Sequence, residues 1–190
     1  MKTLKNSFVA FAIFFALVIS AANVGASPLA ESGQGVAWQQ LSKRVRKELV
    51  TLPYYGVFDN LAYEIDGSTV TLHGQVVRPS TRADAARRVA KIDGVERVVN
   101  QIEVLPLSGF DDRIRREAYR SIFNTSSLYR YALGANPSIH IVVNRGHLTL
   151  EGVVGTGMDK QLAEFAARGV SGVFSVTNNL RAESEERGRR

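Results

Sequence analysis

An internal repeat constrains this chain more than any other feature of its sequence. Residues 61–102 align without a gap on residues 139–180. The residues that both copies share are Thr71, Leu72, Gly74, Val76, Ala85, Gly94, Val95, Val98 and Asn100 in the first copy, and Thr149, Leu150, Gly152, Val154, Ala163, Gly172, Val173, Val176 and Asn178 in the second. Similarity at so long a period indicates that one structural unit was duplicated, so the fold is to be explained unit by unit.

The N-terminus predicts export. Two lysines among the first five residues precede an uncharged apolar run, 8–22, and the Val-Gly-Ala at 24–26 has the small-x-small pattern of a signal peptidase site. We therefore expect residues 1–26 to be a cleaved signal peptide and the mature chain to begin near Ser27. A retained membrane anchor is the alternative, although the run is shorter than the roughly 20 residues that a spanning helix usually needs.

The chain contains no cysteine. A lipoprotein signal, which requires a cysteine to acylate, is therefore excluded, and so are stabilising disulfides. Export without a lipid anchor points to the periplasm of a bacterium with two membranes. The net charge of +6 favours anionic partners, and for an exported protein lipid headgroups are favoured over nucleic acid.

Each unit is predicted to open with an amphipathic helix. Apolar residues recur at helical spacing at Leu41, Val45, Leu49 and Leu52, and again at Phe110, Ile114, Ala118 and Ile122. Ser108, with Asp111 three residues later, indicates where the second of these helices starts.

A β-hairpin is expected to follow each helix, with short turns at 67–68 and 145–146. The pairs that this register brings to one face are Ile65 with Val70 and Tyr63 with Leu72 in the first unit, and Val143 with Leu148 and Ile141 with Leu150 in the second. Two diverged copies that predict the same register support the hairpin.

A second helix and a third strand complete the unit. The apolar positions of the second helices are Ala85, Val89 and Ile92, and Ala163, Ala167 and Val170. The third strands alternate through Val98, Asn100, Ile102 and Val104, and through Val176, Asn178 and Leu180. Gly94 and Gly172 are expected to supply left-handed C-terminal helix caps. Short links imply a right-handed crossover, which makes the third strand parallel to the second.

The expected architecture is α+β: two tandem αββαβ units, each a three-stranded mixed sheet with two helices on one face, at residues 37–105 and 108–182. Residues 183–190 mix acidic and basic side chains without apolar periodicity, and a disordered tail is expected there. A unit of this size has a core that is only marginally stabilising, so the two units are expected to lean on each other.

The strand at 70–76 (VTLHGQV) and the segment at 94–102 (GVERVVNQI), with their second copies at 148–154 and 172–180, resemble the BON domain. This module occurs in osmotically induced periplasmic proteins and in lipoproteins associated with the outer membrane. The resemblance covers nearly all of the mature chain, and it implies two tandem BON domains. Some members of the family bind phospholipid, but no short binding motif exists that could be transferred residue by residue.

Several repeated residues are interpreted as structural. Strand parity points Asn100 and Asn178 toward the apolar face, where an amide is costly unless hydrogen-bonded, so both are expected to satisfy backbone groups of a loop or a helix end. The positions assigned a structural role by their repetition are Gly74, Gly94, Asn100, Gly152, Gly172 and Asn178.

No catalytic constellation is present in the sequence. The glycine spacing at 152–157 fits neither the dinucleotide nor the P-loop pattern. A turn that glycine residues make possible is therefore favoured over a phosphate-binding site. His73, His140 and His147 are not repeated between the copies, so incidental surface residues are favoured over metal ligands. No G-x-S-x-G elbow occurs. We therefore expect a protein that is not an enzyme, with no cofactor, no metal and no small-molecule substrate.

Basic and aromatic residues are interleaved over the first helix of the second unit and the connection after it. The candidate lipid-binding residues are Arg113, Arg116, Tyr119, Arg120, Tyr129, Arg130 and Tyr131, and Arg115, Phe123 and Leu128 lie in the same stretch. Aromatic rings suit the headgroup level of a bilayer, and arginines pair with phosphates. The alternative is that Phe123, Leu128 and one tyrosine close the core under a long loop while the arginines solvate the helix.

Two functions of different classes follow. The first is a non-catalytic, periplasmic module of envelope maintenance under osmotic stress that binds anionic phospholipid surfaces peripherally. The second is an adaptor that docks on an envelope or membrane protein and has no lipid affinity of its own, as implied by similar domains attached to channels and secretion pores. Nucleic acid is not an expected partner of either.

Overall fold

The structure is a computed structural model that describes residues 28–134 and 136–184, with side chains from residue 37 onward. The expected signal peptide and residues 185–190 of the expected tail lie outside the described residues. Across those that are described, no helix has both the length and the apolar character needed to cross a membrane.

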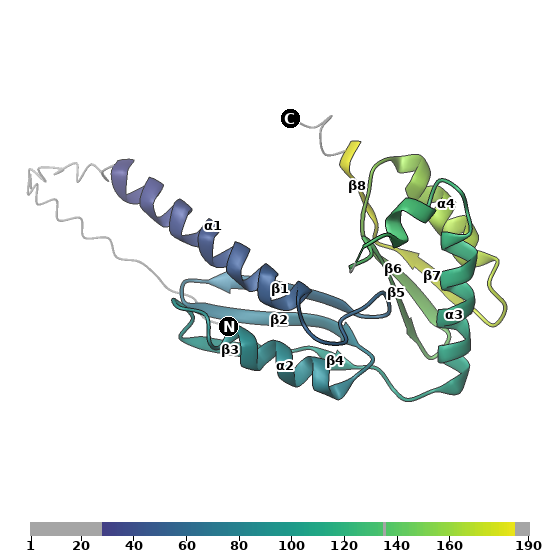
Figure 1. Cartoon of the computed structure of the whole chain (residues 1–190), viewed down its shortest axis with the longest axis horizontal. Coiled ribbons are helices and arrows are strands. Elements are labelled where there is room, and N and C mark those ends of the chain that lie inside the picture. Colours follow the sequence, from purple (N-terminus) through teal and green to yellow (C-terminus); the bar gives the residue numbers. More distant parts are fainter. Residues whose placement is uncertain (1–27, 135, 185–190) are drawn as a thin grey trace, which may run out of the picture.

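The two halves of the chain have the same order of elements (Figure 1). The first unit comprises α1 (Pro28–Val50), β1 (Asn60–Asp66), β2 (Thr69–Val76), α2 (Pro79–Val89), β3 (Arg97–Asn100) and β4 (Glu103–Val104). The second comprises α3 (Gly109–Phe123), a short 3-10 helix η1 (Tyr129–Ala132), β5 (Ile139–Asn144), β6 (His147–Val154), α4 (Gly157–Arg168), β7 (Ser175–Asn178) and β8 (Arg181–Ala182).

The predicted α+β architecture and hairpin registers are confirmed. Ile65 pairs with Val70 across β1 and β2, and Val143 pairs with Leu148 across β5 and β6, both antiparallel. The third strand of each unit runs parallel to the second, as a right-handed crossover requires.

The third strand is interrupted, which the alternation did not predict. In the first unit β3 ends at Asn100 and pairing with β2 resumes at β4. The Asn100 side chain lies at the break: its oxygen accepts from the Ile102 amide at 3.2 Å and its nitrogen donates to the Arg82 carbonyl of α2 at 3.0 Å. Asn178 makes the equivalent bonds to the Leu180 amide and the Lys160 carbonyl. The repeated asparagine therefore ties the break in the strand to a helix.

The repeated glycines act differently from one another. Gly94 and Gly172 have positive φ angles of 96° and 86°, but the helix caps are Ala90 and Gly169. The expectation that Gly94 and Gly172 cap the helices is therefore wrong, because each helix ends earlier and the glycine instead reverses the chain into the third strand.

Gly74 and Gly152 allow the hairpin strands to approach closely. Gly152 has φ of 118°, and a Cβ built on it would overlap the Ser138 carbonyl oxygen. Gly74, with φ of 115°, stands in the same relation to the Asn60 carbonyl. Any side chain there would have to push the first strand of the hairpin away.

Each unit has its own core beneath its two helices. The first buries Val45, Leu49, Val70, Leu72, Ala85 and Val89, and the second buries Ile114, Ala118, Ile122, Ile141, Leu148, Leu150, Ala163 and Ala167. The second core is also closed by Phe123, Leu128 and Tyr131, as the alternative to a lipid role proposed. Phe110, expected in the apolar stripe of its helix, is instead 39% exposed, because it precedes the turns of α3 that cover the sheet.

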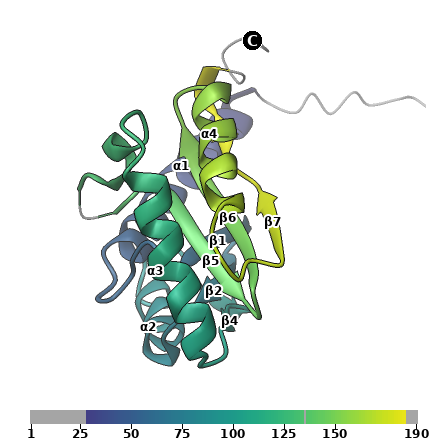
Figure 2. The same ribbon diagram turned by 90° about the vertical axis from the view of Figure 1, so that its right-hand side faces the viewer.

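One segment of the first unit, residues 51–59, packs against the second and is called the docking loop below. Its Val57 and Phe58 side chains contact the second core, and the Val57 carbonyl accepts a hydrogen bond from the Ile141 amide at 2.7 Å. Helices α3 and α4 lie on the side of the second sheet that faces away from the first unit (Figures 1 and 2). The units therefore lean on each other, as expected, and the α3–α4 side of the second stays open.

The described C-terminal residues contact the second unit. Ala182 of β8 pairs with β6 and is 2% exposed, and the Ser184 amide donates to the Gly155 carbonyl at 3.2 Å. The disordered tail from residue 183 stays a prediction.

The close approach at Gly152 predicts the effect of a single methyl group. Replacing Gly152→Ala adds a Cβ that meets a backbone oxygen at a φ that side chains avoid, so we expect a loss of at least about 1–3 kcal/mol in the free energy of unfolding. Chemical denaturation followed by circular dichroism measures it. Gly109→Ala is the control, since a Cβ there has open space around it. Equal stability of both variants would contradict the assignment.

Candidate functional site

The outward face of α3 carries three arginines. Arg113, Arg116 and Arg120 are exposed, and their spacing places them along one side of the helix. Among the residues that the structure describes, no carboxylate forms an ion pair with any of the three. Their guanidinium groups are therefore available to an external anion.

Arg115, in the same stretch, belongs to the interior. It is 2% exposed, donates to the Val143 carbonyl at 2.6 Å and forms an ion pair with Asp112. Its charge is thus neutralised and its donors hold α3 on β5, so the expectation that it contributes to a basic surface is wrong. A helical wheel distinguishes it, because Arg115 lies on the side of Ala118 and Ile122.

The tyrosines of the candidate set divide between surface and interior. Tyr129, in η1, is 59% exposed. Tyr119 is partly covered: its ring makes edge contacts with Phe123, at 4.8 Å between centroids, and with Phe58 of the docking loop, at 6.3 Å. Tyr119 therefore takes part in the contact between the units as well as in the surface of α3.

Arg130, whose side chain is 58% exposed, and Tyr131 both contact the start of α4. The Asp159 carboxylate accepts from Arg130 at 2.7 Å and from the Tyr131 hydroxyl at 2.9 Å, and the Gly155 amide donates to the same hydroxyl at 2.8 Å. Burial would raise the pKa of Asp159, but hydrogen bonds from Thr156, Tyr131 and Arg130 outweigh it and hold that pKa below its usual range. These two candidate residues therefore stabilise the η1 connection.

The same cluster explains the glycine-rich turn. Thr156 caps α4 by accepting from the Asp159 amide at 3.1 Å, and the Asp159 side chain lies at the helix N-terminus where an external phosphate would rest. A carboxylate already satisfies this positive end of the helix. The interpretation of residues 152–157 as a glycine-containing turn, and not a phosphate site, agrees with this geometry.

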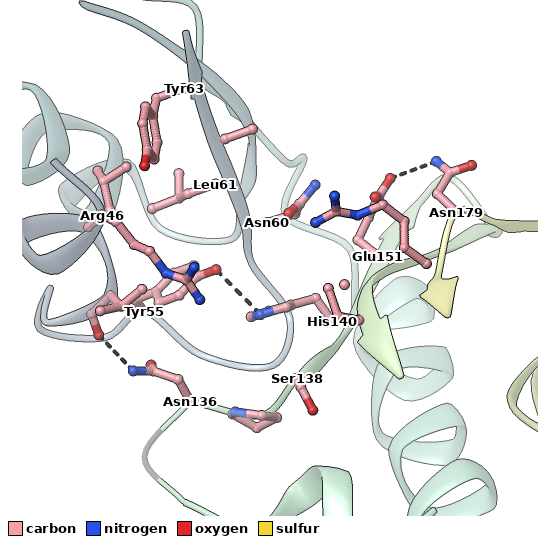
Figure 3. Close-up of a pocket in the computed structure, with 17 residues that line it drawn as sticks. Arg46, Tyr55, Asn60, Leu61, Tyr63, Asn136, Ser138, His140, Glu151 and Asn179 are labelled. Atoms are coloured by element: carbon pink, nitrogen blue, oxygen red, sulfur yellow. Dashed lines mark hydrogen bonds between the residues drawn. The ribbon is translucent and has the colours of Figure 1, made fainter. Parts of the chain in front are cut away.

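A polar cleft of about 580 Å³ lies between the two units (Figure 3). Arg46 of α1 and Asn60 and Tyr63 of β1 line one side, and Asn136, Ser138, His140 and Glu151 line the other. Several of its polar groups already have partners in the chain. The Asn136 side chain donates to the Val50 carbonyl at 2.9 Å, and Asn179 donates to Glu151 at 2.7 Å. The cleft is thus the polar seam of the contact between the units.

His140 is the central group of this seam, and sequence reasoning treated it as an incidental surface residue. Its Nδ1 lies 3.3 Å from the Gly56 carbonyl and its Nε2 lies 3.4 Å from the Tyr55 hydroxyl. A neutral ring satisfies both contacts by donating to Gly56 and accepting from Tyr55. Burial lowers the pKa of His140, although Gly56 and the Asp59 and Glu151 charges act in the opposite direction.

The docking loop is held in place by Asp59. Its carboxylate accepts from the Gly56 amide at 3.0 Å and from the Val77 amide at 2.7 Å. Burial raises the pKa of Asp59, and these hydrogen bonds oppose the rise. Burial, with the nearby Asp59 charge, also raises the pKa of Tyr55 to about 12, so its hydroxyl stays protonated as a donor to His140.

The histidines and acidic side chains were compared with the arrangement that a metal ion requires. Within residues 28–134 and 136–184, no group of three or more acidic or histidine side chains is arranged to hold a metal ion. His147 contacts the Ser175 hydroxyl at 2.7 Å, and His73 lies 3.8 Å from Glu64.

One exposed feature escaped sequence reasoning altogether. Phe174, 69% exposed, lies with its ring centroid 5.9 Å from that of Phe110. The available signal was the repeat itself, since Phe174 aligns with Glu96 of the first copy. The second unit has a phenyl ring where the first has a carboxylate, so the surfaces of the two units differ at this position.

The comparison with protein families supports the duplicated fold. The BON domain family matches residues 39–106 and, separately, residues 111–184. This chain belongs to the BON domain family. Its two BON domains follow each other in tandem, and the arginine face of α3 belongs to the second.

Two solved structures of CdsD, a structural protein of the type III secretion system of Chlamydia trachomatis, are similar to this tandem BON chain. The structure of the CdsD C-terminal domain is 13% identical with a TM-score of 0.30, and the match covers 76% of this chain and 65% of that one. The other is 10% identical with a TM-score of 0.28, and covers 79% of this chain and 96% of that one. The comparison with curated proteins returned no match.

The lowered pKa of His140 predicts how the contact between the BON domains responds to pH. The unfolded chain binds a proton near the ordinary histidine pKa of about 6.5, while the folded chain resists it, so folding is disfavoured as pH falls below that value. We expect acidification from about pH 7.5 to 5.5 to lower the free energy of unfolding of the wild type more than that of His140→Gln. Denaturant titrations at several pH values in this range measure the shift.

The series stops near pH 5.5 because the raised pKa of Asp59 acts in the opposite direction at lower pH. A difference that stays constant, or that moves in favour of the wild type on acidification, would show that His140 accepts a proton in the folded contact.

Proposed function

We propose that this tandem BON protein is a non-catalytic, peripheral phospholipid-binding module of the bacterial envelope. The anionic headgroups of a bilayer surface are its ligand, and the outward face of α3 is the surface that meets them. Export to the periplasm and a part in envelope maintenance under osmotic stress belong to the same proposal, and they are supported by the leader-like N-terminus and by membership of the BON family.

The observation that carries the proposal is the set of Arg113, Arg116 and Arg120 without ion pairs. A carboxylate three or four residues away can pair with an arginine on a helix surface, as Glu164 does with Arg168 in α4. Glu117 has this spacing from Arg113 and from Arg120, yet in the described part of the chain no ion pair joins it to either. The three arginines are exposed. Helix α3 lies on the side of the second domain that the first leaves open (Figure 2). Guanidinium groups match the geometry of phosphate oxygens and can bind them in a bidentate manner.

The shape of the arginine face of α3 and the side chains at its borders indicate how it binds. The arginines lie on the exposed surface of a helix, which suits a flat, multivalent anion such as a bilayer. Exposed apolar side chains lie near both ends of α3, with Phe110 at its start and Tyr129 and Leu133 after its end. Rings at headgroup depth add affinity that salt does not screen.

Charge reversal tests the proposal. Replacing Arg113, Arg116 and Arg120 by glutamate removes three attractions of about 1 kcal/mol each, so we expect binding to phosphatidylglycerol vesicles to fall at least about a hundredfold. Co-sedimentation at low and raised salt measures it. All three positions are exposed, and circular dichroism confirms that the variant folds.

The matched control reverses three cations of the first domain, Lys47, Arg82 and Lys91. All three are exposed. Arg87 and Arg88 are left intact because Arg87 forms an ion pair with Asp84, and Arg88 contacts Glu48 and the Thr51 carbonyl. Equal losses in both variants would mean that only net charge matters. A wild type that binds no anionic vesicle would refute the lipid proposal and favour an adaptor that docks on an envelope protein.

A further inference from the structure

Two phenyl rings form an exposed pair at the end of the second domain where α3 begins. Phe110 belongs to the first turn of α3, and Phe174 precedes β7. Both lie over the β5–β6 turn: a Cβ added to Gly146 would be 2.7 Å from the Phe174 ring and 3.3 Å from the Phe110 ring. Figure 2 shows the start of α3 and the end of this hairpin at the same, lower end of the domain.

Hydrogen bonds join the segments beneath the rings. The buried Asp111 carboxylate accepts from the Arg145 amide at 2.9 Å and from the Gly146 amide at 2.8 Å, which joins the start of α3 to the turn. The Phe174 amide donates to the Gly146 carbonyl at 2.9 Å. The rings thus lie over a helix start and a turn that hydrogen bonds join to each other.

Cations surround the pair. The Arg113 guanidinium lies over the Phe110 ring, 5.3 Å from its centroid, and Arg145 is exposed at the turn with φ of 52°. Three acidic side chains of this region have partners of their own: Asp111 binds the turn, Asp112 pairs with Arg115, and Glu103 accepts from the Asn144 side chain. Apolar rings bordered by cations form a surface complementary to a negatively charged interface.

The first domain has the same backbone and the opposite chemistry. Glu96 occupies the position of Phe174, and its amide donates to the Ser68 carbonyl at 2.9 Å, as that of Phe174 does to Gly146. The Glu96 side chain is exposed and accepts from the Ser68 hydroxyl at 2.9 Å. The fold therefore does not require a phenyl ring at this position, and the exposure of Phe174 has no structural explanation within its own domain.

We propose that Phe110, Phe174, Arg113 and Arg145, here called the aromatic tip, insert into the interface of an anionic phospholipid bilayer. The two rings lie at the boundary between headgroups and acyl chains, and the two arginines bind lipid phosphates above them. This inference rests on the proposed lipid function and adds its anchoring point and depth. A bilayer fits better than a protein partner because Arg113 belongs both to the tip and to the arginine face of α3, so one extended basic surface continues from the rings.

A tryptophan placed at the tip reports its depth. The single natural tryptophan, Trp38, is first replaced by phenylalanine, and Phe174→Trp is then introduced into the full chain. We expect its fluorescence to shift to shorter wavelength and to be quenched when the protein binds phosphatidylglycerol vesicles with brominated acyl chains. Glu96→Trp in the same background is the matched control at the equivalent backbone position, and it should remain unquenched on the same vesicles.

A second variant measures the loss of the ring together with the addition of a negative charge. Phe174→Glu installs the residue of the sister domain at an exposed position, and we expect it to weaken vesicle binding about tenfold or more. Circular dichroism verifies the fold.

Each outcome decides one claim. Vesicle binding without quenching at position 174, equal quenching at positions 96 and 174, or undiminished binding by Phe174→Glu would overturn insertion of the tip and leave peripheral binding through α3 standing. If the wild type binds no anionic vesicle, both the proposed function and this inference fail, and a protein partner for the tip is the remaining interpretation.

Discussion

The contact on which the arrangement of this molecule depends is the one between the docking loop and the edge of β5. Val57 and Phe58 leave the first domain to complete the core of the second, and Asp59 holds the loop by accepting from two amides. Two small domains without disulfides gain buried apolar area in this way. The same contact decides which surfaces stay open, because it covers one side of the second domain and leaves α3 and α4 facing outward.

The two domains share their backbone contacts and differ in their surface residues. The glycine that allows close approach of the hairpin and the asparagine at the strand break make the same contacts in both domains. The solvent-facing positions differ: Glu96 corresponds to Phe174, and the turn after β2 has Arg78 and Pro79 where the second domain has Thr156 and Gly157. The interior contacts are the same in the two domains and the surfaces differ. This is the pattern expected when two copies of one fold have separate functions, and the proposed lipid surface belongs to the second domain.

The candidate site was only partly predictable from its sequence. Arg113, Arg116 and Arg120 were selected because charges interleave with aromatics, and the structure exposes all three. The same pattern also selected Arg130 and Tyr131, which bind Asp159 across the η1 connection. Sequence proximity could not separate the arginines of α3 from Arg130 and Tyr131. The connection after α3 folds back onto the domain, and helical periodicity does not describe where its residues lie. Phe174 was missed for the converse reason, since it is far from α3 in sequence and adjacent to it in space.

The sequence by itself determined the units, the strand registers and the parallel third strand, because these follow from local periodicity and from a repeat that states each pattern twice. Tertiary structure alone decided the role of residues whose partners are distant. His140 has a lowered pKa because a loop of the other domain buries it, and Phe110 is exposed because the sheet ends before it. Periodicity reports which face a residue occupies, whereas burial and charge depend on what the rest of the chain places against that face.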